Sequence, residues 1–153
     1  MITIWRSSLL LFAAAALLAA CSPEAPKFRG TDVTGAEFGK ELALTAHDGK
    51  PRSLADFRGK AVVLFFGYTH CPDICPTTLA DMAAVMKQLG KDAARVQVLF
   101  VTVDPERDTP EILAKYVPAF DASFLGLSGD AVATQRAAKE FKIFYEKRPG
   151  GAP

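Results

Sequence analysis

Residues 65–82 read FFGYTHCPDICPTTLADM. The stretch opens on the end of the run AVVLFF at 61–66, which is apolar at every position, as expected of a central strand covered on both faces. Two cysteines follow, Cys71 and Cys75, and a proline stands directly after each. Beyond them, apolar residues recur at the helical period, at Leu79, Met82, Ala83, Met86 and Leu89. The cysteines are therefore predicted to lie where a central strand is followed by the N-terminus of a helix.

The rest of the domain alternates between strand-like and helix-like patterns. An Asp48-Gly49 pair between two strand-like segments predicts a β-hairpin ahead of the cysteines. After them, the patterns predict a buried strand at 96–103, a helix with Thr109 as its N-cap, a helix at about 130–141 and a strand-like segment at 142–147. The strand at 61–66, the helix after the cysteines and the strand at 96–103 are predicted to form a right-handed βαβ unit. Alternation of this kind predicts an α/β sandwich with helices on both faces of the sheet.

The first 20 residues have the layout of an export signal, because one charge, Arg6, precedes a short apolar run closed by small residues. The sequence Leu-Ala-Ala-Cys at 18–21 resembles a bacterial lipoprotein box, in which Cys21 would carry the lipid. The alternative is an uncleaved N-terminal anchor. Both readings place the folded part on the periplasmic side of a bacterial membrane and tie it there. We expect a signal peptide at 1–20, a tether at 21–39 and one domain at 40–153.

Composition narrows the class of protein further. A chain of 153 residues is long enough for one compact domain but not for two. The 18 basic and 17 acidic residues nearly balance and are interspersed, whereas a nucleic-acid-binding surface needs a clustered basic excess. We therefore expect no nucleic-acid partner, and we expect a monomer.

The Cys71–Cys75 pair could be a structural disulfide, a redox pair, a nucleophile with its resolving partner, or a pair of metal ligands. A disulfide across so short a loop would close little chain entropy, which favours a chemical role over an architectural one. At a helix N-terminus a thiolate is stabilised, so its pKa should be lowered. Asp73 would oppose this stabilisation unless it serves as a cap, and Pro72 and Pro76 would stiffen the loop.

Three segments together resemble the Sco/SenC family of thioredoxin-like copper chaperones for cytochrome c oxidase assembly. They are GYTHCPDICPTTLADM at 67–82, VTVDPERDTPEILAKYV at 101–117 and FLGLSGD at 124–130, and the resemblance extends over about 41–147. It implies a thioredoxin-like fold, copper ligation by Cys71 and Cys75, and delivery of copper to the CuA centre of oxidase subunit II, or reduction of that centre's cysteines. A chaperone of this kind is not expected to be an enzyme.

Histidine, methionine and aspartate side chains elsewhere in the chain are candidate additional ligands. Thiolates suit Cu(I), and an added imidazole would also suit Cu(II). His70 adjoins a cysteine and is expected to point away from the sulfurs, although it remains an alternative ligand, and His47 is expected to be a turn residue. Met82 and Met86 have the spacing of core residues. Asp104 and Asp108 frame a loop at the C-terminal end of a strand, where they would either shape a binding site or serve as turn and cap residues.

In the resembling family the third copper ligand is a histidine that follows the strand resembled by KIFYEK. The chain ends at Pro153 without such a histidine, so we expect the sequence to be a fragment that lacks the closing part of the fold. Three other functions remain open. They are a metal-free thiol–disulfide oxidoreductase, a thiol peroxidase, and a copper-storing or copper-sensing module.

Overall fold

The computed structural model describes residues 28–146. The chain divides into two units, residues 1–35 and residues 36–153. In the described part of the first unit, the Asp32 carboxylate accepts hydrogen bonds from the Thr34 N–H, at 2.9 Å, and from the Thr34 hydroxyl, at 2.6 Å. The predicted signal peptide and the lipidation residue Cys21 lie outside the described residues. Within residues 28–146, no helix is both long enough and apolar enough to span a membrane.

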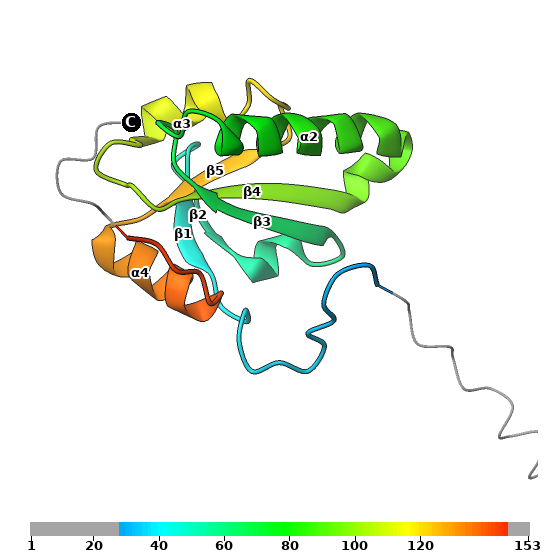
Figure 1. Cartoon of the computed structure of the whole chain (residues 1–153), viewed down its shortest axis with the longest axis horizontal. Helices are drawn as coiled ribbons and strands as arrows, with labels where there is room; N and C mark the ends of the chain where they lie inside the picture. The colour runs from blue at the N-terminus through cyan, green and yellow to red at the C-terminus, as the bar shows by residue number, and fades with distance from the viewer. Residues whose placement is uncertain (1–27, 147–153) are drawn as a thin grey trace, which may run out of the picture. The chain divides into compact units, whose positions relative to one another are not determined.

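The second unit is built on one sheet of five strands in the order β2-β1-β5-β4-β3 (Figure 1). The strands are β1 (Ala43–Ala46), β2 (Pro51–Ser53), β3 (Ala61–Gly67), β4 (Val96–Thr102) and β5 (Leu125–Ser128). The antiparallel pair β1 and β2 forms the predicted hairpin, with Leu44 opposite Arg52 and a left-handed Gly49, at φ 79°, in the turn. The opposite side of β1 pairs antiparallel with β5.

The two long strands β3 and β4 are parallel, with Ala61 opposite Val96 and Gly67 opposite Thr102, and β4 pairs in parallel with β5. The predicted βαβ unit is therefore confirmed. The central position predicted for β3 is wrong, because within residues 28–146 β3 lies at the edge of the sheet and β4 and β5 lie inside it. The apolar pattern of β3 reports that both of its faces are covered, and it carries no information on which strands lie beside it.

The helices form a layer on each face of the sheet (Figure 1). α2 (Ile74–Leu89) and α3 (Pro110–Tyr116) cover one face, and α4 (Ala131–Glu140) covers the other. Two short 3₁₀ helices, η1 (Leu54–Phe57) and η2 (Gly90–Arg95), connect strands and helices. The Thr109 hydroxyl caps α3 by accepting from the Ile112 N–H at 3.4 Å, and the Asp130 carboxylate caps α4 by accepting from the Ala133 N–H at 2.7 Å.

Buried residues of β4 contribute to both apolar clusters, one on each face of the sheet. Leu99 and Val101 face the cluster beneath α4, whereas Val98 and Phe100 face the cluster beneath α2 and α3. Met82 and Met86 belong to the second cluster, which confirms that they are core residues. The same cluster also contains Leu79, Leu113, Val117 and Phe124, all without exposed surface.

The structure differs from the sequence pattern at the end of α2 and after α4. Leu89, placed on the apolar stripe of α2, is 38% exposed, because it is the last residue of the helix. Residues 143–146 of the predicted strand 142–147 form no regular structure, and they follow a left-handed Lys142 at φ 56°. The Ile143 N–H bonds the carbonyl of Ala138 at 2.8 Å, so this segment turns back onto the end of α4.

Candidate functional site

The two cysteines occupy the predicted junction between β3 and α2. The helix begins at Ile74, so Cys75 lies in its first turn, whereas Cys71 lies in the preceding loop. Asp73 holds the N-cap position, but its side chain makes no capping hydrogen bond to the backbone, so the expected capping role is not confirmed. Its carboxylate instead accepts from the Thr77 hydroxyl at 3.4 Å. Backbone N–H groups at this end of the helix are free to point toward an anion.

Both side chains are free thiols and both are buried, with 8% of Cys71 and 4% of Cys75 exposed. The Cys75 N–H donates a hydrogen bond to the Cys71 sulfur at 3.4 Å, which holds that sulfur against the first turn of α2. The Cys75 sulfur lies beside Gly67, the last residue of β3. A methyl group placed on Gly67 would come within 3.0 Å of it and within 3.0 Å of the Phe100 ring. A residue without a side chain is therefore needed beside Cys75.

The two thiols differ in acidity. Burial raises the pKa of Cys71, but hydrogen bonds from the Cys75 thiol and from the backbone N–H groups of 73–75 outweigh burial and lower that pKa below its ordinary value. Burial raises the pKa of Cys75 to about 11, and the neighbouring Cys71 adds to the rise. The expectation of a lowered pKa at the helix N-terminus thus holds for Cys71, which accepts from the N–H groups of 73–75. It is wrong for Cys75, because burial outweighs the hydrogen bond that this thiol accepts from the Tyr68 N–H.

The predicted loop of Asp104 and Asp108 lies at the C-terminal end of β4, beside the cysteine loop. Asp104 has a turn role, since its carboxylate pairs with Arg107 and its carbonyl accepts from the Asp108 N–H at 2.9 Å. Asp108 has no exposed surface, and it accepts from the Thr69 N–H, the Thr69 hydroxyl and the Thr102 hydroxyl. Sequence reasoning did not single out the two threonines, because only the fold brings 69, 102 and 108 together.

Neither histidine lies with the cysteines. His70 is 47% exposed, with its Nδ1 3.2 Å from the Thr69 hydroxyl and 3.8 Å from Asp108 Oδ1. His47 lies in the hairpin turn, as expected, and its Nδ1 accepts from the Gly126 N–H at 3.0 Å, which ties the turn to β5. Within residues 28–146, no three side chains of His, Cys, Asp or Glu gather closely enough to hold a metal ion.

Tyr116 is a further residue of this region that the sequence pattern did not reveal. Its ring packs on Phe100, with centroids 6.0 Å apart, and its buried hydroxyl has no hydrogen-bond partner in the described part of the chain. Burial raises the pKa of this phenol, and the negative charges of Cys75, Cys71 and Asp108 add to the rise. The phenol therefore lies within the electrostatic reach of both thiols.

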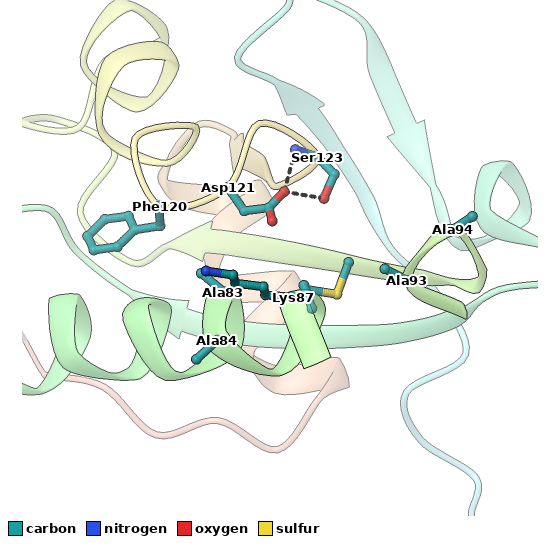
Figure 2. Close-up of a pocket in the computed structure, with 9 residues that line it drawn as sticks. Ala83, Ala84, Lys87, Ala93, Ala94, Phe120, Asp121 and Ser123 are labelled. Carbon is teal, nitrogen blue, oxygen red and sulfur yellow. Dashed lines mark hydrogen bonds between the residues drawn. The ribbon is translucent and has the colours of Figure 1, made fainter. Parts of the chain in front are cut away.

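A cavity of about 660 Å³ lies elsewhere on the same face of the sheet (Figure 2). Its wall consists of the end of α2, η2 and the loop before β5, where the Asp121 carboxylate accepts from the Ser123 N–H at 2.8 Å and from the Ser123 hydroxyl at 2.6 Å. Neither cysteine lines it. The thiol pair, rather than this cavity, is therefore the chemical site.

The difference in acidity predicts selective alkylation of the reduced, metal-free protein. At pH 8, a thiol with a pKa of about 11 is roughly one part in a thousand thiolate, so iodoacetamide should modify Cys71 well before Cys75. Labelling of Cys71 should level off once its thiol is ionised, whereas labelling of Cys75 should keep rising with pH. Peptide mass spectrometry across pH 6–10 measures both rates. Faster labelling of Cys75 at neutral pH would contradict the assignment.

Comparison with known proteins places this geometry in a family. The SCO1/SenC family matches residues 30–152. The SCO2 homolog of Bos taurus mitochondria is 43% identical over 111 residues, which cover 71% of this chain and 42% of that protein. The chain thus spans about two fifths of the length of this curated relative.

Solved structures agree with the sequence match. Bradyrhizobium japonicum ScoI with copper bound aligns with a TM-score of 0.71 and 39% identity, over 75% of this chain and 73% of that one. A SCO1/SenC family lipoprotein from Bacillus anthracis aligns with a TM-score of 0.59 and 30% identity, over 67% and 64% of the two chains. These alignments confirm the predicted thioredoxin-like α/β fold. This chain therefore belongs to the SCO1/SenC family.

Proposed function

We propose that this chain is a membrane-tethered, extracytoplasmic copper chaperone that binds Cu(I) through Cys71 and Cys75. The observation that carries the proposal is the pair itself: two buried free thiols, joined by a hydrogen bond from the Cys75 N–H to the Cys71 sulfur. A copper-bound structure of the Bradyrhizobium relative, at 39% identity, supports the choice of metal.

The two cysteine sulfurs are suitable ligands for Cu(I). Soft thiolate sulfur favours Cu(I) over harder metals, whereas a closed structural zinc site needs four ligands. Two thiols four residues apart across a helix start can both reach one small ion, and Cu(I) accepts low coordination numbers. For Cu(II) we propose that a third, nitrogen ligand comes from a histidine beyond Pro153, since neither His47 nor His70 lies with the sulfurs.

The protein prepares the two thiols differently for binding. Both must lose their protons to ligate metal, so binding releases protons and strengthens as the pH rises. The N–H groups of 73–75 already favour the Cys71 thiolate. Cys75 keeps its proton until a cation approaches, which makes Cys71 the first point of attachment and Cys75 the second.

Anaerobic titration of the purified, reduced protein with Cu(I), in competition with a chromophoric chelator, tests the proposal. We expect one equivalent of Cu(I) to be retained. Protein whose Cys71 and Cys75 have been oxidised to a disulfide should retain none, because ligation requires thiolates. Equal copper retention by the reduced and oxidised forms would place the metal elsewhere and refute the assignment.

The proposed recipient is the CuA centre of cytochrome c oxidase subunit II. This assignment rests on membership of the SCO1/SenC family. The exposed side chain beside the thiols is compatible with docking to a partner, since Ile74, next to Cys75, is 68% exposed. Transfer of one equivalent of Cu(I) from the loaded protein to a purified, reduced CuA domain would support this step.

A thiol–disulfide oxidoreductase is the second candidate, and the unequal acidities favour it. A more acidic Cys71 could attack a disulfide, and a buried Cys75 of higher pKa could then resolve the mixed disulfide. The two candidates differ in which reagent reacts first. The test is reduction of a disulfide substrate by the reduced protein, with and without one equivalent of Cu(I). If Cu(I) abolishes this reduction at every concentration of the disulfide, the thiol pair binds metal in preference to reacting with disulfides.

We further propose that Cys21 carries lipid and anchors the protein on the periplasmic side of the membrane. The tetrad Leu-Ala-Ala-Cys at 18–21 motivates the proposal, and the Bacillus anthracis relative is described as a lipoprotein. The mature protein should sediment with membranes, and a Cys21→Ser variant should lose the lipid. Mass spectrometry that finds Met1, or an unmodified Cys21, at the mature N-terminus would contradict it.

A further inference from the structure

Asp108 is a fully buried carboxylate that lies beside the thiol pair without belonging to it. It has no exposed surface. Its Oδ2 accepts from the Thr69 N–H at 3.0 Å and from the Thr102 hydroxyl at 2.6 Å, and its Oδ1 accepts from the Thr69 hydroxyl at 2.5 Å. Within residues 28–146, the basic side chain paired with it is His70, whose Nδ1 is 3.8 Å from Oδ1.

These hydrogen bonds join three segments at one end of the sheet. Thr69 lies in the loop between β3 and α2, Thr102 is the last residue of β4, and Asp108 immediately precedes the N-cap of α3. The carboxylate thus fastens the cysteine loop to the neighbouring strand and to the start of another helix. Two of its three bonds go to Thr69, which is two residues from Cys71 in the sequence.

The short connection between Thr69 and Cys71 leaves the backbone little freedom once Thr69 is held. The Cys71 N–H also bonds the carbonyl of Tyr68 at 3.3 Å, so the loop is a closed turn at this point. After the turn, the Cys71 sulfur accepts from the Cys75 N–H at 3.4 Å. Any movement of Thr69 would therefore be passed on to the place where the two sulfurs meet.

From these contacts we infer that Asp108 is the positioning residue of the thiol pair: by holding Thr69, it fixes the Cys71 sulfur relative to Cys75 before any metal arrives. For copper, the inference rests on the proposed function. Asp108 acts through Thr69 rather than as a ligand. A charged acceptor in a buried site makes stronger hydrogen bonds than a neutral one, which suits a residue that must hold a loop still.

Equilibration with glutathione tests this without copper. Oxidised glutathione takes two electrons and two protons from Cys71 and Cys75, which gives the protein disulfide and two reduced glutathione molecules. The equilibrium constant measures the effective concentration of one sulfur at the other. Asp108→Ala should lower it about tenfold, the effect of one charged hydrogen bond lost. Asp108→Asn should stay within about threefold of the parent, because its amide can bond both threonines.

Asp121→Ala is the matched control, because Asp121 also accepts from a backbone N–H and a hydroxyl, those of Ser123, in a loop away from the thiols. Its equilibrium constant should equal the parent's. Thermal unfolding of each variant identifies those that fold. If Asp108→Ala does not fold, Thr69→Val removes one of the same bonds, and a constant about threefold lower is expected.

The inference is overturned if Asp108→Ala, or Thr69→Val in its place, retains the parent's equilibrium constant. It is also overturned if Asp108→Asn lowers the equilibrium constant as much as Asp108→Ala does. The negative charge of Asp108, rather than its hydrogen bonds to Thr69, would then determine how readily the two thiols form a disulfide. Competition titration with Cu(I) on the same variants should show a parallel weakening. If the parent protein fails to bind Cu(I), the proposed function fails, while the glutathione result still decides the role of Asp108.

Discussion

Replacement of Cys75 by alanine should weaken Cu(I) binding by more than about 100-fold, which is the upper end of what loss of a mere supporting residue costs a metal site. The reason is the chelate. Once Cys71, in the loop before α2, holds the ion, Cys75 in the first turn of α2 can bind it without a second encounter from solution. Anaerobic competition with a chromophoric Cu(I) chelator measures the loss.

A control variant separates the loss of a ligand from the loss of buried volume. Thr134 is 1% exposed, lies on α4 on the opposite face of the sheet, and has a hydroxyl without a partner among the described residues. Thr134→Ala removes a similar small group and should leave Cu(I) affinity unchanged. If Cys75→Ala binds Cu(I) as tightly as the parent, the copper ligands lie elsewhere in the chain.

Gly67→Ala should weaken Cu(I) binding by displacing the Cys75 sulfur, without removing either thiol. The added methyl group would lie 3.0 Å from that sulfur and 3.0 Å from the fully buried Phe100 ring. Because both neighbours are held in the core, the sulfur must move away from its place beside β3. We expect Cu(I) affinity to fall about 10- to 100-fold and the free energy of unfolding to fall by about 1–3 kcal/mol.

Gly126→Ala is the matched control for this change. A methyl group on Gly126, in β5, would lie 3.1 Å from Leu113 and 3.1 Å from Val117, which belong to the same apolar cluster as Phe100. The two variants should therefore lose similar stability in denaturant unfolding, but only Gly67→Ala should lose affinity for Cu(I). Equal Cu(I) affinities in the two variants would show that the methyl group added at Gly67 does not displace the Cys75 sulfur.

Local patterns were sufficient for most of the fold. A helix cap depends on residues within one turn, so Thr109 was identifiable as the N-cap of α3. The helical pattern placed the start of α4 at about residue 130, next to its first residue, Ala131. The alternation of apolar strand and amphipathic helix was sufficient for the βαβ unit and for helices on both faces. For the same reason the cysteines could be placed at a strand–helix junction, since every residue involved lies within 65–82.

Patterns failed where the outcome depends on neighbours distant in the sequence. An apolar strand has the same pattern at the edge of a sheet as inside it, so the edge position of β3 was missed. Residues 143–146 resemble a strand, but a strand also needs a partner to pair with, and within the described residues they instead turn back onto α4. Strand propensity only favours an extended backbone, and a segment becomes a β-strand when a neighbouring strand pairs with it.

The family could be predicted from the motifs at 67–82, 101–117 and 124–130, and the thiol pair from the spacing of Cys71 and Cys75, because motifs and spacings are read directly along the chain. The difference between the two thiols depends on how the chain folds around them. Cys71 accepts from the N–H groups of 73–75 at the start of α2, whereas the Cys75 sulfur lies beside Gly67 and burial raises its pKa to about 11. The tertiary structure also decided that Asp108 holds Thr69, which lies 39 residues away along the chain, through hydrogen bonds that form only when β3 and β4 pair side by side.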